Sequence, residues 1–135
     1  MMNWTKFALA VVVAAVISIV LNTVYYAVTA AGHTWEMTKE EPIMSLMLLN
    51  HFVFAALLAY MYPFGYQGRS PVLEGVRFGA LMGLVMFVPT GLIVRAAWDV
   101  PITPYFLLDI VVAAVVTALM GVAIGLIYGR QLHTA

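Results

Sequence analysis

Long apolar runs, each interrupted by only a few polar residues, dominate the chain. Four of them reach the roughly 20 residues of helix needed to cross a hydrocarbon core about 30 Å thick. They lie at residues 7–30, 42–62, 71–98 and 104–128. The first run is longer than the apolar core of a secretory signal, which favours a retained span over a cleaved leader. The pattern therefore predicts an all-α integral membrane protein, in which residues 1–135 form one four-helix transmembrane bundle.

Proline, glycine and hydroxyl residues mark the ends of these runs. A serine–proline pair at 70–71 and a threonine–proline pair at 103–104 each predict an N-cap hydroxyl followed by proline at the first helical position. We expect the segment 63–68 to end the second helix and Gly129 to cap the last one. The residues left over form short connections and tails, so any function is expected in the bilayer or at its edge.

The few basic residues predict the orientation of the bundle. Those near the N-terminus, the second connection and the C-terminus are Lys6, Arg69, Arg77 and Arg130, whereas the opposite side is mainly acidic. The positive-inside rule then places both termini in the cytoplasm. We therefore expect an up-down-up-down bundle in the inner or plasma membrane, with its N- and C-termini inside.

Composition supports the membrane interpretation and excludes other classes of protein. The chain is 64% hydrophobic and 9% charged, whereas a soluble domain has about 45 to 50% apolar and about 25% charged residues. Its net charge of zero gives no electrostatic basis for binding nucleic acid. Without cysteine it has no disulfide, thiol chemistry or cysteine-ligated metal. The lipid bilayer is the partner that the composition predicts.

Small residues recur at every fourth position in the last two runs. The stripes are Gly75, Gly79 and Gly83 in the third run and Gly121, Gly125 and Gly129 in the fourth. Such stripes let helices in a membrane approach closely. We expect one tight antiparallel contact between these two helices; the alternative is that one stripe faces a second copy of the chain.

A short internal similarity relates the two halves of the chain. Residues 48–50 align with 107–109 at an offset of 59, and several positions further along also match. This similarity predicts two related helical hairpins, as in some transporters. Chance matching between two helices rich in leucine, valine and alanine is the alternative.

Five polar residues within the runs form the candidate site, because polar groups in a membrane span are costly and need a reason to face inward. They are Asn22, Asn50, His51, Arg95 and Asp109. Four of them lie four residues from a small residue, so they are expected to share its helix face and to point into the bundle. These pairs are Asn22 with Ser18, His51 with Ala55, Arg95 with Gly91 and Asp109 with Ala113. Pro89 should bend the third helix. We expect its outer end to lean away from the fourth helix and to open a pocket around these residues.

Each of these residues has a structural and a functional interpretation. Structurally, the Arg95 side chain could extend to the membrane surface or form an ion pair with Asp109; functionally, it could bind an anion. Asp109 would form that ion pair in the structural interpretation, and would bind a proton or a ligand in the functional one. His51 forms an interhelical hydrogen bond, shuttles protons, or ligates a metal or tetrapyrrole. Asn22 and Asn50 are typical of helix–helix contacts and serve otherwise to orient a ligand.

No catalytic motif accompanies these residues, and neither a nucleophile elbow, an HExxH motif nor a phosphate-binding glycine loop occurs. A metal site of His51 with His33 and Glu36 lacks supporting ligands, so we expect no metal, and no cofactor is assigned. The sequence favours a non-enzymatic homo-oligomer or accessory subunit of a membrane complex. The alternatives are a small-molecule-binding or proton-coupled transport protein, and a membrane enzyme that acts on a lipid or isoprenoid through His51 and Asp109.

Overall fold

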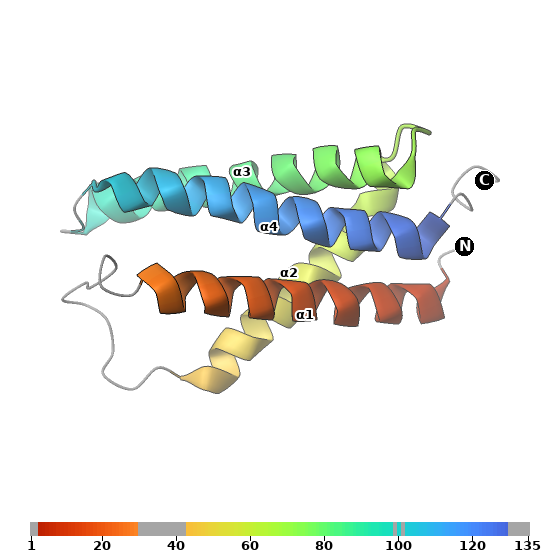
Figure 1. The fold of residues 1–135 in the computed structure, drawn as a ribbon, viewed down its shortest axis with the longest axis horizontal. Coiled ribbons are helices and arrows are strands. Elements are labelled where there is room, and N and C mark those ends of the chain that lie inside the picture. The colour runs from red at the N-terminus through yellow and green to blue at the C-terminus, as the bar shows by residue number, and fades with distance from the viewer. Residues whose placement is uncertain (1–2, 30–42, 99, 101, 130–135) are drawn as a thin grey trace.

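In the computed structural model the chain forms four long helices and, over the part that the structure describes, no strand (Figure 1). The structure describes residues 3–29, 43–98, 100 and 102–129. The helices are α1 (Trp4–Thr29), α2 (Met44–Gly65), α3 (Pro71–Ala97) and α4 (Pro104–Tyr128). Each is long and apolar enough to span a membrane, which confirms the predicted all-α fold with four membrane-length helices.

The two predicted N-caps behave differently. The Ser70 side chain accepts a hydrogen bond of 3.3 Å from the backbone N–H of Leu73, so it caps α3 as predicted. Thr103 occupies the N-cap position of α4 as predicted, but its side chain makes no capping hydrogen bond. Proline at the first helical position is common to both helices, and it suits a helix start whether or not a side chain caps it.

The second helix continues through Pro63 and ends at Gly65, within the segment 63–68 that was expected to end it. A proline inside a helix leaves the carbonyl group four residues earlier without its donor. Here that group belongs to Ala59, and the hydroxyl of Tyr128 donates to it at 2.8 Å. The helix therefore passes the proline because a side chain from α4 replaces the lost backbone hydrogen bond.

The helices do not pack as four equivalent neighbours. The most extensive contact joins α3 and α4, and α1 packs against both α4 and α2. Lys6 Nζ donates to the Tyr128 carbonyl at 3.3 Å, so α1 begins beside the end of α4. By contrast, α2 runs at a steep angle to the other helices and contacts α3 sparsely, and its Met44 end lies well away from α3 (Figure 1).

Backbone contact between α3 and α4 occurs along the glycine positions. A Cβ atom added to Gly75 would lie 2.5 Å from the carbonyl oxygen of Gly121, and one added to Gly83 would lie 3.0 Å from that of Ala113. These pairs run in opposite directions along the two helices. The buried glycines are Gly75, Gly79, Gly83, Gly121 and Gly125. Gly129 lies outside this contact, since a Cβ there would meet no atom within 4 Å; with φ +61° it ends α4.

Contact between α3 and α4 continues on the far side of Pro89. A Cβ atom at Gly91 would lie 2.5 Å from Cε2 of Phe106, whose ring is buried. The two helices are therefore in contact here through the Phe106 side chain rather than through backbone atoms. That the outer end of α3 leans away from α4 stays a prediction. An opening lies beside α2, where its contact with α3 is sparse.

Candidate ligand pocket

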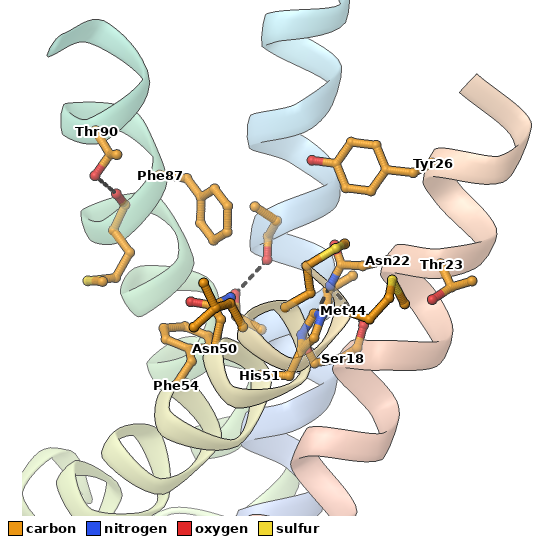
Figure 2. A pocket seen from close by; sticks show the side chains of 16 residues that line it. Ser18, Asn22, Thr23, Tyr26, Met44, Asn50, His51, Phe54, Phe87 and Thr90 are labelled. Carbon is orange, nitrogen blue, oxygen red and sulfur yellow. Dashed lines mark hydrogen bonds between the residues drawn. The ribbon is translucent and has the colours of Figure 1, made fainter. Parts of the chain in front are cut away.

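A cavity of about 800 Å³ lies among the four helices, beside the N-terminal half of α2 (Figure 2). Every helix contributes to its wall. Ligand-binding pockets in proteins commonly enclose about 300 to 1,000 Å³, so this volume suits a small organic molecule. The cavity is partly open rather than fully enclosed.

A hydrogen-bonded cluster joins α1 to α2 at one wall of this cavity. Ser18 Oγ lies 2.8 Å from His51 Nδ1. The Asn22 side-chain amide donates to the Ser18 carbonyl at 2.8 Å and also approaches Ser18 Oγ at 3.3 Å. The cluster fixes the imidazole by its Nδ1 atom. Within the described part of the chain, Nε2 of His51 makes no hydrogen bond.

Asn50 stands next to this cluster and also lines the cavity. Its side chain is exposed in the isolated chain, and no described residue forms a hydrogen bond with its amide. An amide within a membrane span is costly unless it meets a hydrogen-bonding partner. Asn50 therefore offers a free donor and a free acceptor to whatever occupies the cavity.

Apolar side chains form much of the remaining wall. They are Met44, Met47, Phe54, Met86, Phe87 and Val116. The Thr90 hydroxyl, on the same wall as Phe87, donates to the Met86 carbonyl at 2.7 Å (Figure 2). Methionine side chains are flexible and adapt to irregular apolar shapes. The cavity thus combines a polar wall with an adaptable apolar one.

Arg95 and Asp109 do not line the cavity. The hydroxyl of Tyr25 donates to Asp109 Oδ1 at 2.6 Å, which joins α1 to α4. The Arg95 guanidinium lies 3.8 Å from the centroid of the Phe106 ring, and its Nη1 donates to the Gly91 carbonyl at 3.3 Å. The structure thus brings three of the five predicted polar residues to the cavity and holds the other two elsewhere.

Sequence reasoning did not include Ser18 in the candidate site, although this residue links Asn22 to His51. Its signal is its position, because Ser18 precedes Asn22 by four residues and therefore shares its helix face. A small residue on that face is also typical of close helix packing. Ser18 is 4% exposed, so it does pack, but its hydroxyl also orients the imidazole.

Glu74 is a second residue that the sequence analysis missed. Its side chain is only 1% exposed, in the first turn of α3. Glu74 Oε1 accepts a hydrogen bond of 3.3 Å from the backbone N–H of Arg69. The sequence signal that could have identified Glu74 is its place in the first turn of the helix, where an acidic side chain interacts favourably with the helix dipole. The contact ties the connection between α2 and α3 to the start of α3, on the opposite side of the glycine contact from Phe106.

Two of the three residues in the metal-site hypothesis, His33 and Glu36, lie outside the described residues. Over the ranges that the structure does describe, no three histidine, aspartate or glutamate side chains gather in one place. The third residue, His51, has its Nδ1 atom engaged with Ser18.

The chain matches no protein-family model, no curated protein and no solved structure. No activity, ligand or partner is therefore carried over from a relative. Functional inference has to proceed from the cavity and its lining.

Proposed function

We propose that this chain is an integral membrane protein that binds a small amphipathic molecule in the cavity among its helices. The observation that supports this function is the division of the cavity wall. Asn22, Asn50 and His51 offer hydrogen-bonding groups, while methionine and phenylalanine side chains line much of the rest. A molecule with a polar head and an apolar body would satisfy both parts at once.

The ligand would enter from the bilayer rather than through a pore. The first turns of α2 are exposed, and α2 contacts α3 sparsely. Met86 and Phe87, which line the cavity on α3, are also exposed. In a membrane this gap faces lipid, so an amphipathic molecule could move sideways into it. No path across the membrane is needed for such binding.

The proposed orientation has both termini in the cytoplasm and the helices arranged up-down-up-down in an inner or plasma membrane. Lys6, Arg69 and Arg77 support it through the positive-inside rule. The contact of Lys6 with the end of α4 supports a common side for the two ends of the bundle. The cavity would then lie in the outer half of the bilayer.

Glycine packing would hold α3 against α4 in this bundle, since close approach of backbones favours helix association in lipid. The approach of Gly75 to Gly121 within one chain supports this role. A second copy would then use another face. That the chain forms a homo-oligomer or is an accessory subunit of a larger complex stays a prediction. The exposed apolar side chains do not support it specifically, because a surface that faces lipid has to be apolar as well.

Binding is better supported than acid–base catalysis or proton-coupled transport by His51 and Asp109. Both alternatives require the two groups to act at one site. His51 lines the cavity, whereas Asp109 lies outside it and accepts a hydrogen bond from Tyr25. A binding function needs only the residues that the cavity already brings together.

Filling the cavity tests the proposal. Thr90→Trp would place a large side chain at the cavity wall, whereas Ile93→Trp would place the same side chain at a position on α3 that is 64% exposed and lines no part of the cavity. The measurement is binding of an environment-sensitive alkyl fluorophore by the purified protein in phosphatidylcholine nanodiscs. We expect saturable binding that Thr90→Trp abolishes and Ile93→Trp retains. Equal binding by both variants would contradict the proposed site.

A further inference from the structure

Charge is absent from the described lining of the cavity, which contains no lysine, arginine, aspartate or glutamate side chain. Arg95 and Asp109, the two charged residues expected there, interact with Phe106 and Tyr25 instead. A charged head group in the cavity would therefore find no fixed opposite charge among the described residues of the lining. Burial of an uncompensated charge is strongly unfavourable.

The groups that the cavity does offer are neutral and of both hydrogen-bonding kinds. The Asn50 amide supplies a donor and an acceptor, neither of which is used by a described residue. His51 Nε2 is also available, because the contact with Ser18 uses Nδ1. A hydroxyl group both donates and accepts, so it can satisfy an amide and an imidazole nitrogen together.

Given the proposed function, on which this step rests, we infer that the ligand is an uncharged lipid amphiphile whose hydroxyl-bearing head is bound between Asn50 and His51. Its apolar body lies against the methionine and phenylalanine wall, with Phe87 on the side of the cavity opposite the Ser18–His51 cluster (Figure 2). The sparse contact between α2 and α3 lets that body continue into the surrounding bilayer.

Three photoreactive probes with the same alkyl chain and different heads test this inference: a primary alcohol, a sulfonate and a trimethylammonium. Each carries a diazirine in the chain and is added to the full chain in phosphatidylcholine nanodiscs. The positions of adducts are then read by peptide mass spectrometry. The sulfonate arm also tests whether His51 supplies a positive charge to an anionic head.

Asn50→Leu is the decisive variant, because it removes the amide while keeping a side chain of similar size. Asn50 has no hydrogen bond to a described residue, so the fold should tolerate the change. Loss of one or two hydrogen bonds predicts labelling by the alcohol that is about ten-fold weaker. The matched control is Met61→Leu, at an exposed position of α2 outside the cavity, which should leave labelling unchanged.

Selective labelling of the cavity by the alcohol, weakened by Asn50→Leu and unchanged in Met61→Leu, is the expected result. Labelling by the sulfonate or the trimethylammonium that equals or exceeds that of the alcohol would overturn the inference of an uncharged head. Labelling that Asn50→Leu leaves unchanged would overturn it too. In either case the proposed binding function would stand. Absence of saturable cavity labelling by all three probes would instead contradict the proposed function itself.

Discussion

The hydroxyl of Tyr128, in the last turn of α4, donates a hydrogen bond of 2.8 Å to the carbonyl oxygen of Ala59 in α2. This is the carbonyl that Pro63 leaves without its helical donor. Ala59 is 0% exposed, so water cannot take the place of the missing donor. The contact therefore both preserves α2 beyond the proline and joins it to α4, a helix pair with few other contacts.

Removal of this hydroxyl should destabilise the bundle only while the proline is present. Tyr128→Phe should lower the free energy of unfolding by about 1 kcal/mol, because it leaves the Ala59 carbonyl unsatisfied. Pro63→Ala restores an N–H at that position, so the same change should then cost much less. Unfolding by dodecyl sulfate in mixed micelles measures the cost of Tyr128→Phe with Pro63 and with Ala at position 63. The control is Tyr60→Phe, at an exposed position. An equal cost of Tyr128→Phe in the two backgrounds would contradict this account.

The two helix starts that share a hydroxyl–proline sequence should respond differently to alanine. Ser70→Ala should lower the free energy of unfolding by about 1 kcal/mol, since it removes the side-chain hydrogen bond to Leu73 N–H. Thr103→Ala should cost less than about 0.5 kcal/mol, because the Thr103 side chain makes no capping bond. The same micelle titration distinguishes them. A larger cost at Thr103 than at Ser70 would refute the structural assignment of the caps.

The fold was predictable because hydrophobic length and helix-end residues are local features of the sequence. Four apolar runs gave four helices, and Ser70 gave a true N-cap. The end of α2 falls within the predicted segment 63–68, but the partner that accompanies its proline was not predictable in this way. The donor to the Ala59 carbonyl is Tyr128, a residue 65 positions from Pro63.

The candidate site was predictable only in part for a similar reason. Four-residue spacing tells which side chains share a face of one helix, and Asn22 does share the face of Ser18, whose hydroxyl meets His51. It does not give the rotation of one helix against another. Asp109 was therefore expected in the pocket but bonds to Tyr25, and Arg95 lies over the ring of Phe106.

The hydrogen bond between Tyr25 and Asp109 should contribute to the contact of α1 with α4. Tyr25→Phe should lower the free energy of unfolding by about 2 kcal/mol, because the bond of 2.6 Å has a carboxylate acceptor. In an Asp109→Asn background the acceptor is a neutral amide, and the cost should fall to about half of that. Unfolding titrations of the four proteins at one pH give the coupling. Equal costs in the two backgrounds would contradict a contribution from the charged acceptor, and no cost in either background would mean that the bond contributes nothing.

Glycines that contact backbone should tolerate alanine less well than a glycine that contacts a side chain. At Gly75 an added Cβ would lie 2.5 Å from the Gly121 carbonyl oxygen, a backbone atom that cannot rotate away as the end of a side chain can. At Gly91 it would lie 2.5 Å from the Phe106 ring, which can rotate away. We expect Gly75→Ala to cost about 3 kcal/mol and Gly91→Ala about 1 kcal/mol.

The higher helix propensity of alanine favours both of these variants by a similar amount, about 1 kcal/mol, so their difference reports the packing alone. Unfolding in mixed micelles measures the two stabilities. Crosslinking between cysteines introduced at Val76 and Leu119, at exposed positions of α3 and α4, reports whether the two helices have separated. A Gly91→Ala variant less stable than Gly75→Ala would show that α3 and α4 are held together at their Phe106 end rather than by the contact between Gly75 and Gly121.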